Sequence, residues 1–326
     1  MFRRTQWSEE FLLDRLVYAS RDKGGEETIV APQELVEREV DTINSDGVRY
    51  ERTSLQPGTP AAESCVVSNG DTVELFGLRI SNLSRAEVFQ RIGERIERRA
   101  PGIIVTPNVD HICRCHSDET FREAYSAAFL SLPDGMPLMW AAKLLGRPLK
   151  EKLSGSDMVP LLSEYAAGHG YSVFFLGAAE GVAAEASQRL CRRYPGLRVT
   201  GVYSPPLYFE RDERENSRVI ALLRDSAPDI CFVALGSPRQ ETWMRGHSVA
   251  SGVPVMIGVG AGLDFVAGRV RRAPVWMQRF GLEWSWRLCM EPRRLWRRYL
   301  IEDSLFLALA WREFWKSRRA ERPAGK

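Results

Sequence analysis

The spacing of apolar residues changes along the chain. Between residues 73 and 268, short apolar runs alternate with stretches in which apolar residues recur every three or four positions. The runs predict strands over residues 73–78, 102–106, 128–132, 172–177, 198–203, 230–236 and 254–259. The stretches between them predict helices over residues 85–98, 109–127, 137–145, 157–167, 182–194, 211–225 and 240–247.

Most of the predicted strands are apolar on both sides, and nearly all are followed by a helix. Such strands are typical of a parallel sheet that helices cover on both faces. The sequence therefore predicts an α/β fold with a Rossmann-like, mainly parallel sheet. Ligands of these sheets bind beyond the carboxyl ends of the strands, so polar residues at those ends are the first candidates for function.

The two ends of the chain lack this alternation. Residues 1–72 are polar and become rich in Gly, Pro and Ser, which predicts a mostly disordered extension with a short helix near residues 9–18. A small folded unit is the alternative for this segment. Residues 269–326 predict a helical appendage, in which Pro292 separates a helix over residues 282–290 from one over 293–318. Residues 73–268 form the predicted α/β core.

Charge adds to this picture because it is unevenly distributed. The net charge of the 326-residue chain is only +3, but residues 269–326 contain 15 Lys and Arg against 6 Asp and Glu, with six of the nine Trp. A basic, Trp-rich appendage predicts an anionic partner surface. The scattered cysteines predict reduced thiols and a cytoplasmic location. No signal peptide is recognised, and the longest apolar run is far below the about 20 residues of a membrane span.

Polar residues follow the first two core strands after 73–78. Thr106 and Asn108 flank Pro107, and Asp134 follows Pro133. A carboxylate at this edge can accept a proton from an attacking hydroxyl. Plain local structure is the alternative, because Asn is a good helix cap and Asp134-Gly135 is a common turn pair.

Glycines and charges mark the later strand ends. Lys152 precedes a capped helix start, where backbone N–H groups and a cation can hold phosphate. Glycine loops after the strands suit the close approach of a nucleotide, although tight turns explain them equally well. The candidates for the nucleotide loops are Gly177, Gly236, Gly258, Gly260 and Asp264. Neither the full dinucleotide fingerprint nor a P-loop is present.

Metal and cofactor chemistry has little support in the sequence. His111, Cys113, Cys115 and His116 are close in sequence, but no second pair has zinc-site spacing. No Asp-x-Asp motif is present to hold a divalent ion on a diphosphate. We therefore expect no metal and no cofactor, with Arg, Lys or helix N-termini meeting the phosphate charge.

Taken together, the motifs resemble those of the WecG/TagA/CpsF glycosyltransferase family, glycosyltransferase family 26. The resemblance spans residues 73–299 and is specific because the motifs recur in order. In the core they are Thr106-Pro107-Asn108, Asp134-Gly135, Gly155-Ser156-Asp157, Gly236 to Glu241, and Gly258 to Ala261. In the appendage they are Arg272-Ala273-Pro274, Gly281 to Trp284, Arg287-Leu288, Glu291 to Arg293, and Arg297 to Tyr299.

The resemblance implies an inverting transfer of N-acetylmannosamine, its uronic acid or glucose from a UDP-sugar to a polyprenyl-diphosphate-linked sugar. It implies Asp134 as the general base. The implied substrate-binding residues are Thr106, Asn108, Lys152, Gln240, Arg287, Arg294 and Arg297. At the position of Lys152 the family usually has Arg, so the charge is kept but the bidentate fork is lost.

The resemblance also implies that the appendage touches the cytoplasmic membrane, with the protein peripheral on its inner face. Beyond residue 299, Leu307, Trp311, Phe314 and Trp315 can share one face of a basic helix, which is an interfacial pattern. Packing on the protein's own domain or on a dimer partner is the alternative. No nucleic-acid partner is expected, and homo-oligomerisation stays open.

Two other functions remain as alternatives. One is a nicotinamide-dependent oxidoreductase, which the incomplete fingerprint disfavours. The other is a non-catalytic, membrane-docked protein in a polysaccharide assembly complex, which the retention of Asp134, Asn108, Gln240 and the three arginines disfavours. The sequence does not reveal the donor sugar.

Overall fold

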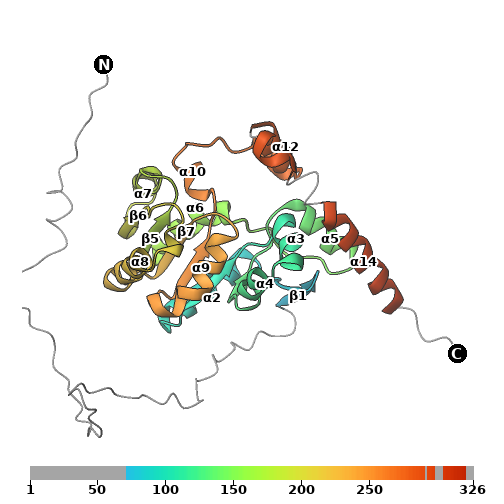
Figure 1. Cartoon of the computed structure of the whole chain (residues 1–326), viewed down its shortest axis with the longest axis horizontal. Coiled ribbons are helices and arrows are strands. Elements are labelled where there is room, and N and C mark those ends of the chain that lie inside the picture. The colour runs from blue at the N-terminus through green and yellow to red at the C-terminus, as the bar shows by residue number, and fades with distance from the viewer. Residues whose placement is uncertain (1–70, 291, 298–303, 321–326) are drawn as a thin grey trace, which may run out of the picture. The chain divides into compact units, whose positions relative to one another are not determined.

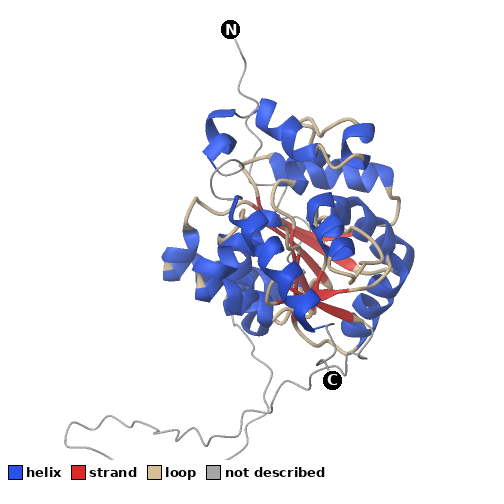
Figure 2. Cartoon of the chain, turned by 90° about the vertical axis from the view of Figure 1, so that its right-hand side faces the viewer, coloured by secondary structure: helices blue, strands red, loops and turns tan. Residues whose placement is uncertain are grey.

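The structure, a computed structural model, describes residues 71–290, 292–297 and 304–320. The expectations for residues 1–70, including the helix near residues 9–18, lie outside this range. The described residues belong to one unit by their mutual contacts, residues 64–326. Within it, helices surround a central sheet, as Figures 1 and 2 show.

The sheet has six strands, all parallel to their neighbours, in the order β4-β3-β8-β7-β5-β6. The strands are β3 (Gly102–Val105), β4 (Leu130–Ser131), β5 (Ser172–Gly177), β6 (Arg198–Tyr203), β7 (Ile230–Ala234) and β8 (Val255–Gly258). This confirms the predicted parallel α/β sheet. The chain first forms β3 and the edge strand β4. It then forms β5 and the opposite edge strand β6, and β7 and β8 complete the sheet between β5 and β3.

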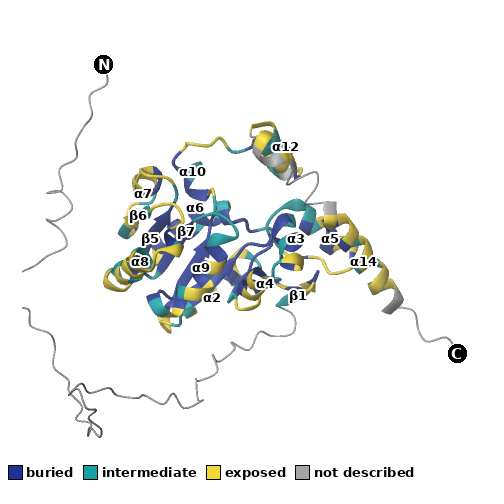
Figure 3. Ribbon diagram, in the orientation of Figure 1, coloured by how far each residue is buried: buried dark blue, intermediate teal, exposed yellow. Residues whose placement is uncertain are grey.

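Alternate residues of each central strand enter two separate hydrophobic cores. In β7, Cys231 and Val233 belong to one core, whereas Ile230 and Phe232 belong to the other. A side-chain period of two places successive residues on opposite faces of a sheet, so both faces are buried. Figure 3 shows the resulting buried centre of the molecule.

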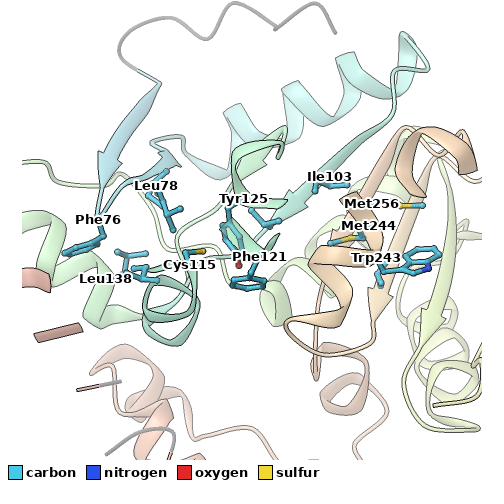
Figure 4. Close-up of a cluster of buried hydrophobic side chains, with 14 of the residues drawn as sticks. Phe76, Leu78, Ile103, Cys115, Phe121, Tyr125, Leu138, Trp243, Met244 and Met256 are labelled. Carbon is cyan, nitrogen blue, oxygen red and sulfur yellow. The ribbon is translucent and has the colours of Figure 1, made fainter. Parts of the chain in front are cut away.

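Helices contribute to both cores. The first core contains residues of α3 (Val109–Ser117), α4 (Glu119–Ser126), α5 (Met136–Leu144), α8 (Glu213–Ser226) and α9 (Arg239–Ser251). Figure 4 shows part of it, with Phe121 and Tyr125 of α4 in the middle and Trp243 and Met244 of α9 at the right. The second core contains residues of α2 (Arg85–Glu97), α6 (Gly155–His169), α7 (Val182–Arg193) and α10 (Gly262–Val266). A short 3-10 helix, η1 (Phe209–Arg211), precedes α8.

Two predicted elements differ from the structure. The single helix expected over residues 109–127 is two helices, because Asp118 has an extended backbone and its side chain caps α4 by accepting from the Phe121 N–H at 3.0 Å. The strand expected over residues 73–78 is a hairpin of β1 (Thr72–Leu75) and β2 (Leu78–Ser81). Phe76 and Gly77 form its turn with positive φ, so the chain reverses where alternation alone predicted an uninterrupted strand.

The appendage is helical, as predicted. It consists of α11 (Val275–Arg279), α12 (Glu283–Met290), α13 (Pro292–Arg297) and α14 (Ser304–Ala320). The sequence does not predict α11, and the helix expected over residues 293–318 is described only as α13 and α14. One face of α14 packs on the core: Phe306 and Leu309 are buried, and the Phe306 ring lies 5.1 Å from that of Phe76. None of the described helices is both long and apolar enough to span a bilayer.

The expected apolar face of α14 needs one correction. Phe314 packs against the first core, whereas Leu307, Trp311 and Trp315 are exposed. The helix therefore divides its large apolar residues between the protein and the solvent. The two proposed roles of this helix, packing on its own domain and presenting an apolar surface, fall on different faces.

Candidate active site

A pocket of about 980 Å³ lies at the carboxyl ends of β5, β6, β7 and β8. We call it the strand-end pocket. Of the predicted nucleotide-loop residues, Gly177, Gly236, Gly260 and Asp264 line it. The appendage supplies another part of its wall through Arg272, Glu283, Trp286 and Arg287. A site built only from the α/β core would thus lack one side.

Gly258, the remaining predicted nucleotide-loop residue, is buried and does not line the pocket. A Cβ at this position would meet the amide nitrogen of Gln240 at 2.7 Å. Gln240 is 3% exposed, and both ends of its amide bind the protein. Its Nε2 donates to Glu241 Oε1 at 2.8 Å, and its Oε1 accepts from the Gly260 N–H at 3.1 Å. In this structure the side-chain amide of Gln240 therefore stabilises the loop at Gly260.

Asp134 lies at the adjoining edge of the sheet, after β4. Its N–H donates to the carbonyl of Pro107 at 2.9 Å, which joins the loops that follow β3 and β4. The carbonyl of Pro133 accepts from the Leu153 N–H at 2.9 Å, which brings the segment containing Lys152 to the same place. Adjacent parallel strands end at one edge, and these backbone bonds hold their loops together.

Thr106 and Asn108 have supporting positions beside Asp134. Thr106 is 5% exposed, and its hydroxyl is near Gly155 at the start of α6, where a Cβ would approach it to 3.2 Å. Asn108 caps α3, because its Oδ1 accepts from the His111 N–H at 3.1 Å. The capping expected from the sequence therefore occurs, while Asn108 stays partly exposed.

The Asp134 carboxyl is partly buried, and its ionisation is perturbed. Burial raises the pKa of Asp134 to about 6, and the positive charges of Lys152 and Arg287 act against this rise. Arg287 comes from α12 and Lys152 from the core. The structure thus brings a core cation and an appendage cation close to this carboxylate, whereas the sequence separates them by more than a hundred positions.

The cations next to Asp134 are held by acidic side chains. Lys152 Nζ lies 2.8 Å from Asp157 Oδ2. Arg287 Nη2 lies 4.0 Å from Glu283 Oε1 in a looser contact, and its guanidinium carbon is 5.3 Å from the centre of the Phe265 ring. The side chains of Arg294 and Arg297 lie outside the part that the structure describes, although their backbone belongs to α13.

Comparison with known proteins identifies the family. The model of the glycosyl transferase WecG/TagA/CpsF family matches residues 73–320. The chain belongs to this family. The match confirms the resemblance found in the motifs and extends it through α14. It favours glycosyl transfer over the nicotinamide-dependent alternative.

Three relatives of this WecG/TagA/CpsF glycosyl transferase share one description. Each of the three is an N-acetylglucosaminyldiphosphoundecaprenol N-acetyl-beta-D-mannosaminyltransferase. The one from Bacillus spizizenii is 36% identical over 205 residues, 63% of this chain and 77% of its own length. The one from Bacillus subtilis is 28% identical over the same shares. A relative from Staphylococcus aureus is 26% identical over 232 residues, 71% of this chain and 89% of its own.

Three charged residues at the site of this glycosyl transferase were not among the predicted site residues: Asp157, Arg272 and Glu283. All three occur in the family motifs, but nothing local in the sequence assigns them a role. Arg272 and Asp157 are 115 positions apart and form an ion pair at 2.6 Å. Only the docking of the appendage on the start of α6 brings them together.

Proposed function

We propose that this protein is an inverting glycosyltransferase that moves a sugar from UDP to a polyprenyl-diphosphate-linked saccharide in the biosynthesis of a cell-surface or exported polysaccharide. The acceptor class follows the printed names of the relatives, and N-acetylmannosamine is the first donor sugar to test. Other N-acetylhexosamines and glucose are the alternatives. One observation carries the proposal: burial raises the pKa of Asp134 to about 6 against the positive charges of Lys152 and of Arg287, and Arg287 lines the strand-end pocket.

Asp134 acts as the general base in the proposed reaction. The carboxylate takes the proton of the acceptor hydroxyl, whose oxygen attacks the anomeric carbon from the face opposite UDP. The bond between the anomeric carbon and the diphosphate oxygen breaks, and UDP leaves with the bonding electrons. A single displacement inverts the anomeric configuration. A carboxylate whose pKa lies near 6 is a stronger base than an ordinary aspartate and is still ionised at neutral pH.

The negative charge that develops on UDP is met by cations of the chain. Lys152 supplies one from the core and Arg287 one from α12. Arg294 and Arg297 are proposed to add two more. Guanidinium groups suit a diphosphate because each can donate two parallel hydrogen bonds. The proposal assigns this task to the side chains and includes no metal ion or cofactor.

The acceptor lipid requires contact with a membrane surface, and we propose that exposed aromatic residues provide it. Trp311 and Trp315 are 65% and 44% exposed on α14, next to the exposed cations Arg312 and Lys316. Trp140 of α5 is 51% exposed and lies beside Gly281. Trp side chains favour the headgroup region of a bilayer, and basic residues favour anionic lipids.

A product assay tests the function directly. The protein is incubated with synthetic N-acetylglucosaminyl-diphosphate lipid and each UDP-sugar in turn, and the products are weighed by mass spectrometry. We expect one added sugar with one donor and loss of product with Asp134→Asn, which is isosteric but cannot accept the proton. Arg91→Lys, on the surface of α2, serves as the control variant. Full turnover by Asp134→Asn would overturn the role of Asp134.

A further inference from the structure

A chain of charged side chains connects the core to the appendage beside the strand-end pocket. Lys152 Nζ lies 2.8 Å from Asp157 Oδ2, and Asp157 Oδ1 lies 2.6 Å from Arg272 Nη1. Arg272 Nε lies 3.2 Å from Glu283 Oε1, and the same oxygen lies 4.0 Å from Arg287 Nη2. Three cations and two anions leave one net positive charge. The chain begins and ends at Lys152 and Arg287, the two cations whose charges lower the pKa of Asp134.

Asp157 is the link on the core side. It lies in the first turn of α6, and its Oδ2 also accepts from the Ser154 hydroxyl at 2.7 Å, so both carboxylate oxygens are engaged. Burial alone would raise the pKa of Asp157, but the hydrogen bond from Arg272 and the charge of Lys152 lower it well below its usual range. Asp157 therefore remains a fixed anion to which the appendage can attach.

Arg272 is the link on the appendage side. Two of its nitrogens bind carboxylates, and the third, Nη2, is buried without a hydrogen-bond partner among the described residues. Within that part of the chain Nη2 therefore keeps two N–H groups without an acceptor, and the residue lines the pocket. The planar fork of Arg272 joins two acidic side chains from different segments through Nη1 and Nε, which a lysine ammonium cannot reproduce.

Resting on the proposed function, we propose that Asp157, Arg272 and Glu283 are positioning residues for the donor diphosphate. They fasten the segment from Arg272 to Arg287 to the core, and this places Arg287 in the wall of the strand-end pocket. In this role Arg272 acts through Arg287. Breaking one link leaves a partly buried charge without its partner, so the attachment responds strongly to a single substitution.

The test measures UDP binding by calorimetry in a double-mutant cycle of Arg272→Lys and Arg287→Ala. We expect Arg272→Lys alone to weaken UDP binding by about tenfold, a difference of about 1.4 kcal/mol. In the Arg287→Ala background the same change should have little further effect, because the residue that it positions is gone. Additive losses in the cycle would overturn the proposal. Arg91→Lys is the matched control, since Arg91 and Asp71 have side-chain exposures of 24% and 21% against 23% and 26% for Arg272 and Asp157.

Limited trypsin digestion gives a readout that needs no substrate. Arg269 and Arg271 are exposed at the start of the fastened segment. We expect Arg272→Lys to speed cleavage there several-fold while the melting temperature stays within a few degrees of that of the wild type. Unchanged cleavage would overturn the attachment. If the wild type bound UDP but formed no product, the proposed function would fail. The binding cycle and the digestion would still test the positioning role, because neither needs product formation.

Discussion

Gln240 and Glu241, neighbours in the sequence, form a buried side-chain hydrogen bond of 2.8 Å behind the strand-end pocket. Glu241 is 1% exposed and Gln240 is 3% exposed. The bond fixes which end of the Gln240 amide carries oxygen, and that oxygen then accepts from the Gly260 N–H. A residue expected to contact a sugar is thus occupied in holding the loop that lines the pocket.

Replacing Gln240 by leucine tests this relationship. The change leaves a buried Glu241 oxygen and the partly buried Gly260 N–H without their partner, so we expect the free energy of unfolding to fall by about 1–3 kcal/mol. Urea denaturation measures this loss. The control is Gln90→Leu, because Gln90 is exposed on α2 and its partner Glu94 lies on the same helix. If Gln240→Leu left stability unchanged but weakened donor binding, the result would instead support direct contact between Gln240 and the sugar.

The raised pKa of Asp134 predicts how activity depends on pH. A general base must be ionised, so kcat/KM should rise with pH and level off above about 6, the pKa to which burial raises this carboxyl. Initial rates between pH 4.5 and 8 measure the profile. Asp134→Glu is the companion variant, because it keeps a base and should retain a rise. A flat profile down to pH 4.5 would contradict this prediction.

The same shift predicts an effect on stability. The folded state binds the Asp134 proton more tightly than the unfolded chain, so the contribution of this group to stability falls as the pH rises from about 4 to about 6. Asp134→Asn removes an ionised group from this partly buried position. We expect the variant to be more stable than the wild type at pH 7, by roughly 1–3 kcal/mol, and the difference to vanish near pH 4. Denaturation of both proteins at pH 7 and at pH 4 measures this difference in stability.

Asp157 should show the opposite dependence. Its pKa is lowered in the folded state by Arg272 and Lys152 despite burial, so it stabilises the fold above its unfolded pKa and loses that effect as the pH falls. Asp157→Asn is therefore expected to lower the free energy of unfolding by roughly 1–3 kcal/mol at pH 7 and by less at pH 3. A loss of equal size at both pH values would show that charge is not the cause.

The sequence predicts the sheet well and the site only in part. Strands such as β5 and β7 are apolar on both sides, which predicts their burial, and their alternation with helices predicts a parallel sheet. The position of Asp134 at a strand end follows in the same way. Motif resemblance points to Arg287, but no periodic pattern brings its charge close to Asp134, because that proximity depends on how the appendage docks.

Helix α14 shows the limit of pattern reasoning at a surface. A helical stripe of Leu307, Trp311, Phe314 and Trp315 is consistent with one apolar face, yet Phe314 packs inward while the others point to solvent. The stripe covers a wide enough arc of the helix that one part of it packs on the core and another part faces solvent. What decides between them is the part of the core on which α14 packs, which includes α3 and the hairpin residue Phe76 beside Phe306. Helix periodicity carries no information about those partners.

The two faces of α14 predict different consequences of substitution. Trp311 is 65% exposed, so Trp311→Ala should leave the melting temperature nearly unchanged and reduce sedimentation with phosphatidylglycerol vesicles several-fold. Phe306 is 6% exposed, and Phe306→Ala should lower the free energy of unfolding by about 3–5 kcal/mol through the cavity that it leaves. Neutral phosphatidylcholine vesicles separate the contribution of charge from that of Trp insertion. If Trp311→Ala sedimented like the wild type with both kinds of vesicle, the exposed face of α14 would have no part in membrane contact.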